Sequence, residues 1–220
     1  MAAACGGGDL EQLLAEQLAY YRAVAPEYER HAIPGAWGGE PEAALEAFAP
    51  AGAVLELACG QAAWTLKLLR HADTITALDA SAEMLAIAAS RVRADRVTFV
   101  QADVFEWEAD RRYDVVFFGF WLSHVPLPRF AEFWSRVEAW LEPGGRVFFV
   151  DDAHRTADEL IYGEDSSIVQ RRLSNGTVHR LVKVPHRPEE LERRLRELGW
   201  AIAVTASASE PFYWGAGGRA

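Results

Sequence analysis

Residues 53–62 read Ala-Val-Leu-Glu-Leu-Ala-Cys-Gly-Gln-Ala, and this stretch decides the fold of the chain. Residues 54–57 form an apolar run of strand length, and the small residues Ala58, Gly60 and Ala62 follow before a helical pattern starts at Trp64. This order predicts a strand, a tight turn and a helix. Small side chains let a ligand approach the backbone, and the N–H groups at the helix start face the turn. Small residues after a strand can also merely ease packing, so the stretch needs support from the rest of the chain.

Further apolar strands follow at regular intervals. They are expected at residues 74–79, 97–100, 114–118 and 146–151, the last one after a Glu-Pro-Gly-Gly turn. Helical patterns separate the strands at residues 64–70, 82–94 and 128–141. This alternation predicts a parallel sheet with right-handed crossovers and helices on both faces. In such sheets ligands bind beyond the carboxyl ends of the strands.

Polar and small residues stand at those carboxyl ends. Asp79 closes the second strand nineteen positions after Gly60, where a carboxylate can accept both ribose hydroxyls of an adenosine. Asp103 follows the third strand, and Gly119 with Phe120 follows the fourth. The spacing therefore predicts a site for a nucleoside cofactor at this edge of the sheet.

This succession resembles the class I S-adenosylmethionine-dependent methyltransferases, in particular their bacterial small-molecule branch, over residues 50–152. The resemblance implies a Rossmann-like α/β fold: a doubly wound, mostly parallel seven-stranded sheet with helices on both faces. It also implies an antiparallel C-terminal edge hairpin, an N-terminal helical lid and an inserted β-hairpin. S-adenosyl-L-methionine is the expected cofactor.

The resemblance places residues of this chain around that cofactor. It sets Glu56 near the amino-acid part, Asp79 on the ribose, Asp103 near the adenine amino group and Gly119 beside the methionine portion. Ala58 and Ala62 stand where the family more often has glycine. The expected cofactor-binding residues are Tyr21, Glu56, Ala58, Gly60, Asp79, Ala80, Met84, Asp103, Val104, Gly119 and Phe120.

Methyl transfer from a sulfonium is an in-line displacement, and a general base is needed only for a protonated acceptor. His124, a few residues after the fourth strand, is a candidate base, although it can equally cap the next turn. Asp151 is the second catalytic candidate, but acids at a strand end also cap helices. The expected acceptor-binding residues are Tyr20, Tyr28, Trp121, His124 and Asp152. Catechol-type methyltransferases hold magnesium on acids after the fourth and fifth strands. No acid directly follows the fourth strand here, so the resemblance implies no metal.

The rest of the chain fits a single domain. Residues 1–8 are expected to form a disordered leader, and residues 9–220 a single methyltransferase domain. This domain is expected to consist of a helical lid (9–49), a cofactor-binding half (50–152) and a substrate-side insertion with the C-terminal strands (153–220). Helical patterns cover residues 10–24, 41–48 and 188–198. Asn175-Gly176 predicts a hairpin between strands at residues 168–173 and 177–184, and two last strands are expected at 200–205 and 212–216.

Composition narrows the function classes. The chain has 220 residues, a formal net charge of -10 and no apolar run long enough to cross a bilayer, which disfavours nucleic-acid and membrane partners. Arg171, Arg172, Arg180 and Lys183 alternate along the predicted hairpin and are interpreted as a solvated strand face. Two cysteines and no secretory leader predict a cytoplasmic protein. A small-molecule acceptor is the expected partner, and a homodimer stays open.

Other functions share some of these features. A nicotinamide-dependent oxidoreductase also combines a strand, a glycine turn and a ribose acid, although Glu56 and the incomplete glycine pattern argue against it. A non-catalytic domain that binds S-adenosylmethionine for regulation is a further alternative. The favoured prediction is an enzyme that methylates a small molecule at oxygen, nitrogen or carbon.

Overall fold

The computed structural model describes residues 7–31, 38–208 and 211–220. Most of the expected leader, residues 1–6, therefore lies outside the described residues. Gly7 and Gly8, expected to belong to that leader, instead form the first residues of helix α1 (Gly7–Val24).

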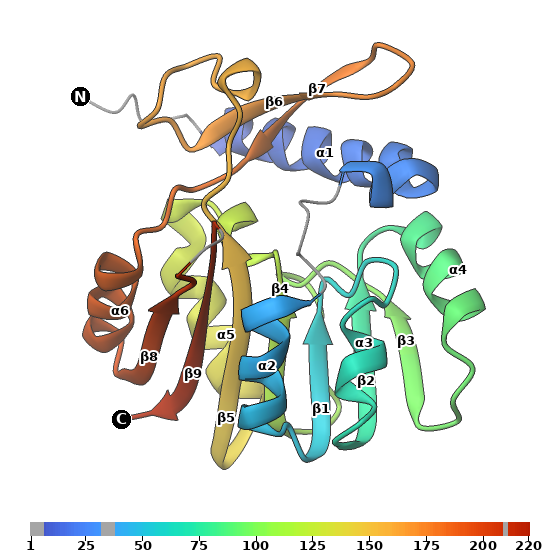
Figure 1. Cartoon of the computed structure of the whole chain (residues 1–220), viewed down its shortest axis with the longest axis vertical. Helices are drawn as coiled ribbons and strands as arrows, with labels where there is room; N and C mark the ends of the chain where they lie inside the picture. Colours follow the sequence, from blue (N-terminus) through green and yellow to red (C-terminus); the bar gives the residue numbers. More distant parts are fainter. Residues whose placement is uncertain (1–6, 32–37, 209–210) are drawn as a thin grey trace.

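The centre of the molecule is a seven-stranded sheet with the order β3-β2-β1-β4-β5-β9-β8 (Figure 1). The first five strands of this order are parallel, and β9 runs antiparallel to both β5 and β8. This arrangement confirms the predicted Rossmann-like sheet with an antiparallel C-terminal hairpin. The strands are β1 (Gly52–Leu57), β2 (Ala72–Asp79), β3 (Val97–Gln101), β4 (Tyr113–Gly119), β5 (Leu141–Asp152), β8 (Trp200–Ala206) and β9 (Phe212–Arg219).

Helices cover both faces because the central strands are apolar on both sides. In β4, Val115 and Phe117 belong to the core under α2 (Gly39–Phe48) and α3 (Thr65–Leu68), where α4 (Ala82–Arg91) also packs. Val116 and Phe118 belong to the opposite core, under α5 (Phe130–Trp140) and α6 (Pro188–Glu197). Successive strand residues point to opposite faces, so one strand supplies both cores.

Helices α3 and α4 end two or three residues before their sequence patterns indicate. Helix α3 ends at Leu68 rather than at residue 70, since the N–H groups of Arg70 and His71 donate to carbonyls three residues back, as in a 3₁₀ turn. Helix α4 ends at Arg91, because Val92 is already extended at φ -112°. Neither difference alters the strand ends that position the site.

Helix α1 lies across the carboxyl ends of the parallel strands, with the hairpin β6 (Ile168–Arg172) and β7 (Val178–Val182) above it (Figure 1). The helix packs Leu13 against Val182 and Val184, and it packs Tyr20 against residues of both hairpin strands. The 3₁₀ turn η1 (Ala25–His31) continues α1 towards α4. We call α1, η1 and the β6–β7 hairpin the cover.

Three further 3₁₀ turns connect these elements: η2 (Leu122–His124), η3 (Leu127–Arg129) and η4 (Ala157–Glu159). The turn η2 follows β4 directly, and it contacts both β5 and β7 beneath the cover. In the described segments, no helix combines the length and the apolar character that a bilayer crossing requires.

Candidate active site

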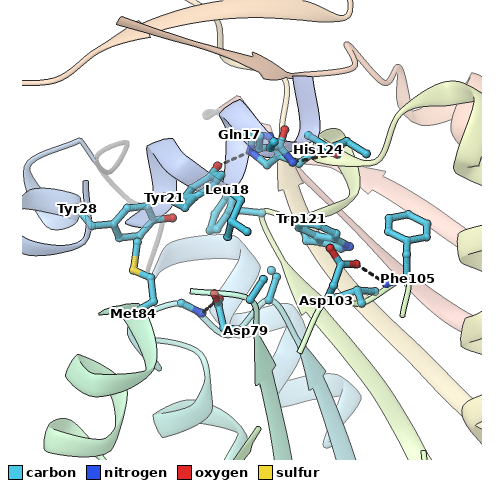
Figure 2. Close-up of a pocket in the computed structure, with 18 of the residues that line it drawn as sticks. Gln17, Leu18, Tyr21, Tyr28, Asp79, Met84, Asp103, Phe105, Trp121 and His124 are labelled. Atoms are coloured by element: carbon cyan, nitrogen blue, oxygen red, sulfur yellow. Dashed lines mark hydrogen bonds between the residues drawn. The ribbon is translucent and has the colours of Figure 1, made fainter. Parts of the chain in front are cut away.

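A cavity of about 230 Å³ lies between the cover and the carboxyl ends of β1, β2 and β4 (Figure 2). Helix α1 closes it with one face of apolar and aromatic side chains, while the strand ends supply its floor. Most expected site residues line it: Tyr21, Tyr28, Ala58, Gly60, Asp79, Ala80, Met84, Asp103, Val104, Gly119, Phe120, Trp121 and His124. Sequence reasoning missed six further lining residues: Leu14, Ala15, Gln17, Leu18, Phe105 and Arg129.

The turn after β1 is built from left-handed backbone. Ala58, Gly60 and Ala62 have φ values of 50°, 53° and 66°. A Cβ atom placed on Gly60 would meet nothing within 4 Å, so this side of the turn opens onto the cavity. The turn therefore offers bare backbone to a ligand, which explains why small residues stand there.

Asp79 joins this turn to the end of β2. Its Oδ2 accepts the Gly60 N–H at 2.8 Å, and its Oδ1 accepts the Ser81 N–H at 2.8 Å. Burial raises the pKa of Asp79 to about 6, while the two N–H donors oppose the shift. Each carboxylate oxygen keeps a further lone pair for a hydroxyl donor, which is what a ribose presents.

Glu56 does not line this cavity. It lines an adjoining cavity of about 370 Å³, which shares Tyr28, Ala58, Gly60 and Gly119 with the first. Its Oε2 accepts the Thr65 hydroxyl at 2.6 Å. Burial raises the pKa of Glu56 to about 8, opposed by the Thr65 hydrogen bond and reinforced by Asp79. A cation beside Glu56 would favour the ionised carboxylate.

Two polar atoms at the same adjoining cavity lack partners. Among the described residues, the buried Gln61 Oε1 and Trp64 Nε1 form no hydrogen bond, and both residues line this cavity. Buried polar atoms are costly when unpaired. One acceptor, one donor and the Glu56 carboxyl group together suit the amino-acid end of a ligand, which carries both an ammonium and a carboxylate.

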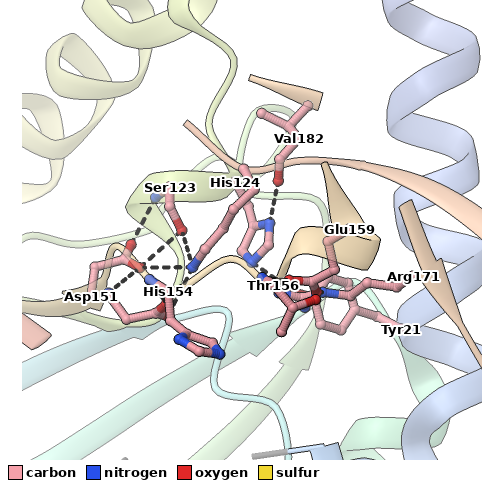
Figure 3. A network of polar contacts seen from close by, with 11 residues as sticks. Tyr21, Ser123, His124, Asp151, His154, Thr156, Glu159, Arg171 and Val182 are labelled. Carbon is pink, nitrogen blue, oxygen red and sulfur yellow. Dashed lines mark hydrogen bonds and ion pairs between the residues drawn. The ribbon is translucent and has the colours of Figure 1, made fainter. Parts of the chain in front are cut away.

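His124 and Tyr21 form the opposite side of the cavity (Figures 2 and 3). His124 Nδ1 lies 2.6 Å from the Val182 carbonyl oxygen, and its Nε2 lies 2.8 Å from the Tyr21 hydroxyl. A carbonyl only accepts, so Nδ1 carries the proton and the Tyr21 O–H donates to Nε2. Burial, assisted by the charges of Lys183 and Arg171, holds the pKa of His124 well below 6.5. The imidazole is therefore neutral.

Gln17 fixes this arrangement from α1. Its amide nitrogen donates to the His124 carbonyl at 3.4 Å, and its Oε1 accepts the Val182 N–H at 3.0 Å. Leu14, Leu18 and Tyr21 recur at helical spacing on α1, and this spacing predicted the helix that lies over the cavity. Gln17 carried no such signal, because its role depends on the hairpin.

Near the third strand the cavity is closed by Phe105 and Arg129. Asp103 Oδ1 accepts the Phe105 N–H at 2.7 Å, and the Arg129 guanidinium lies 3.6 Å from the centre of the Phe105 ring. Trp121 lies beside Asp103 (Figure 2), and its buried Nε1 has no partner in the described part of the chain. The site thus combines a carboxylate, an unpaired donor and apolar surface at this end.

Comparisons with known proteins show the family of the chain. A family model described as a methyltransferase domain matches residues 54–145. The solved structure of a DhpI–SAM–HEP complex is 42% identical to the chain, with a TM-score of 0.82 over 93% of this chain and 96% of that one. A DhpI–SAH complex has the same identity and a TM-score of 0.80. The chain belongs to the class I S-adenosylmethionine-dependent methyltransferases. S-adenosylmethionine (SAM) is its cofactor, and S-adenosylhomocysteine (SAH) is the form left after transfer.

Two other relatives show how far the likeness extends. The ubiquinone biosynthesis O-methyltransferase of Cronobacter sakazakii is 34% identical over 154 residues, which cover 67% of this chain but only 58% of that relative. The glycopeptide N-methyltransferase MtfA, complexed with SAM, is 21% identical with a TM-score of 0.58 and shares the fold. The family assignment sets aside the oxidoreductase alternative.

Besides Glu56, three further expected site residues of this methyltransferase do not line the cavity: Asp151, Asp152 and Tyr20. Asp151 accepts the Ser123 N–H at 2.7 Å and the Ser123 hydroxyl at 2.9 Å, and Asp152 pairs with Lys183 at 2.8 Å. Tyr20 precedes Tyr21 in α1, and successive helix residues point about 100° apart. Tyr20 therefore packs into the apolar cluster beneath the hairpin instead of lining the cavity. Both aspartates are buried and engaged by other protein groups.

The expectation of a solvated basic strand face is wrong for Lys183. Only 2% of its side chain is exposed, and its ammonium lies 2.8 Å from Asp152 and 3.7 Å from Asp151. Arg180 does pair with Glu16 in a partly exposed position, as a surface residue does. Lys183 differs because it directly follows β7, where its ammonium contacts Ser123 of η2 and Asp152 at the end of β5. Within the residues that the structure describes, no group of three or more metal-binding side chains gathers.

Proposed function

We propose that this methyltransferase methylates a hydroxyl oxygen of a small molecule, and that Tyr21 and His124 take up the hydroxyl proton. Bound SAM supplies a methyl group on a positively charged sulfur. The observation that carries the proposal is the 2.8 Å hydrogen bond between Tyr21 and a neutral His124 at the cavity wall. A hydroxyl acceptor must lose its proton as the new bond forms, whereas a neutral amine needs no base before attack.

The proton path follows from the donors and acceptors. An acceptor hydroxyl donates to the Tyr21 oxygen while the Tyr21 O–H donates to Nε2 of His124. As the oxygen–carbon bond forms and the carbon–sulfur bond breaks, one proton moves onto Tyr21 and another from Tyr21 onto Nε2. The lowered pKa of His124 keeps Nε2 unprotonated at neutral pH, so the base is ready before each transfer.

The lining residues support assignments for the cofactor. Asp79 would accept the ribose hydroxyls, Asp103 would lie at the adenine amino group, and Glu56 would face the ammonium. Ala58 and Gly60 would lie against the cofactor through their backbone. Ala80, Met84, Val104, Gly119 and Phe120 would supply apolar contact, and all five line the cavity.

The acceptor side is proposed to consist of Tyr21, Tyr28, Trp121 and His124. Tyr20, Asp151 and Asp152 would act on it only through these residues, since none of the three lines the cavity. The small volume of the cavity and the 42% identical DhpI complex, which holds HEP together with SAM, support a small-molecule acceptor. The name of the curated O-methyltransferase relative supports oxygen as the methylated atom.

We also infer a cytoplasmic enzyme that does not act on nucleic acid. A formal net charge of -10 disfavours a phosphate backbone, which supports that inference. A homodimer is proposed only as a state to test. Light scattering of the purified chain would give one mass or twice that mass.

The cofactor assignment is tested by calorimetry with SAH. Asp79→Asn should weaken SAH binding about tenfold or more, since charged hydrogen bonds to the ribose would be lost. Asp73→Asn, an exposed change on the same strand, should leave the affinity unchanged. Equal SAH affinity in both variants, with thermal unfolding intact, would remove Asp79 from the site.

The proton path is tested by turnover of SAM with panels of hydroxyl and amine acceptors, read by mass spectrometry. His124→Gln should lower kcat about 100-fold or more for hydroxyl acceptors, while SAH affinity changes little. Methylation confined to amines, or an unchanged kcat in the variant, would overturn the proposal.

A further inference from the structure

The last residue of β7 and the two residues that follow it hold the turn that carries His124 (Figure 3). The Val182 carbonyl accepts from His124 Nδ1 at 2.6 Å, and Lys183 Nζ donates to the Ser123 hydroxyl oxygen at 3.1 Å. The Val184 N–H donates to the Ser123 carbonyl at 2.7 Å. The hairpin therefore contacts Ser123 and His124 by both backbone and side chain.

Lys183 is the unusual member of this set. Its ammonium is buried against Asp152 and Asp151, and Asp151 in turn accepts both the N–H and the hydroxyl of Ser123. A buried ion pair of this kind contributes little stability compared with apolar residues of the same volume. Lys183 lines neither part of the cofactor cavity among the described residues. Its position therefore suggests a role that acts through Ser123.

We propose that Lys183 is a positioning residue: by holding Ser123, it keeps His124 oriented with Nδ1 on the Val182 carbonyl and Nε2 towards Tyr21. This inference rests on the proposed function of His124 as the proton acceptor. Without the Lys183 contact, Ser123 keeps its hydrogen bonds to Asp151 and to the Val184 N–H but loses the ammonium that ties its hydroxyl to Asp152. The imidazole is then free to turn or to change tautomer.

The charges around His124 give a second consequence. Tyr21 faces the ring from α1, Arg171 acts on it from β6, Lys183 from the end of β7, and Asp151 lies behind Lys183 at the end of β5. The positive charge of Lys183 disfavours an imidazolium beside it. Removal of that charge therefore raises the pKa of His124 as well as loosening its orientation.

Nitrogen NMR of the full chain with labelled histidine, with SAH added, tests this directly. His124→Gln identifies the His124 signals. The unaltered protein should show a single neutral form with the proton on Nδ1. Lys183→Met should show a mixture of tautomers, a higher pKa for His124, and a kcat about tenfold lower or more at an unchanged SAH affinity.

Arg180→Met is the matched control, since it removes a cation from β7 whose partner is the peripheral Glu16. It should leave the His124 signals and kcat unchanged. An unaltered tautomer and an unaltered pKa of His124 in folded Lys183→Met would overturn the proposal.

Lys183→Met leaves two buried carboxylates without their cation, which destabilises the folded protein. A second variant therefore tests the same contact if Lys183→Met does not fold. Ser123→Ala removes the hydroxyl between Lys183 and Asp151 without changing any charge. It should produce the same tautomer mixture, and a single unaltered tautomer in this variant would also overturn the proposal. If His124→Gln retains full turnover, the proposed proton path fails, while the NMR result still decides the role of Lys183.

Discussion

The Tyr21 hydroxyl lies 2.8 Å from Nε2 of His124, although the two residues are 103 positions apart. Their rings meet edge to face, with centroids 5.5 Å apart and an interplanar angle of 84°. Tyr21 belongs to α1 in the cover, and His124 belongs to η2, the turn after β4. This pair therefore links the cover to the sheet at the point where an acceptor would be held.

Replacing Tyr21 by Phe should lower kcat about tenfold to 100-fold, because the proton path loses its first oxygen while the ring still packs. Steady-state kinetics with a hydroxyl acceptor gives the measurement. Tyr20→Phe is the matched control, since Tyr20 is the neighbouring tyrosine and lies outside the cavity lining. Full turnover in Tyr21→Phe would show that its hydroxyl takes no part.

The pH dependence of turnover should have its acidic limb below pH 6.5. Burial, with Lys183 and Arg171, lowers the pKa of His124, so the neutral base persists as the pH falls through 6.5. Burial also raises the pKa of Tyr21 well above 10, so no alkaline loss from this group is expected near neutrality. Profiles of kcat/KM from about pH 5 to about pH 9 show on which side of pH 6.5 the acidic midpoint lies, and so test the direction of the His124 pKa shift. An acidic midpoint at or above 6.5 contradicts it.

Replacing Glu56 by Gln should flatten part of the pH dependence of stability. The pKa of Glu56 is about 8 in the folded protein, whereas in the unfolded chain this carboxyl group has its ordinary pKa of 4.5. The folded state thus binds more protons between these values, so the free energy of unfolding falls as the pH rises through this window. The free energy of unfolding of the variant, minus that of the parent, should therefore rise by up to about 5 kcal/mol from the acidic to the alkaline end of this window. Urea unfolding at several pH values measures the difference, and parallel curves would contradict it.

Ala58→Gly should stabilise the protein by about 0.5 kcal/mol. Ala58 has a φ of 50°, a left-handed conformation that strains a side chain and suits glycine. Ala88→Gly, in the buried face of α4, should instead cost about 1 kcal/mol or more. Urea unfolding of both variants tests the contrast. A loss at Ala58 as large as that at Ala88 would show that the strain is absent.

Much of the cavity floor could be predicted because parallel strands end at one edge of the sheet. Gly60 and Asp103 each follow a strand that periodicity identifies, and Asp79 ends one, so their meeting follows from topology alone. Tyr21 could be placed on the helix over the cavity because apolar residues recur at helical spacing before it. The burial of Lys183 could not be predicted, since alternation in a hairpin shows two faces but not what packs on either.

The order of strands and helices along the chain, the tight turn after β1 and the acid that closes β2 follow from local periodicity and turn chemistry, which neighbouring residues determine by themselves. The partners of His124 were decided only by tertiary structure: Val182 is 58 positions away and Tyr21 is 103. A hydrogen-bond partner and a shifted pKa depend on which distant segments exclude water from a side chain. That packing is a property of the folded chain rather than of any stretch within it.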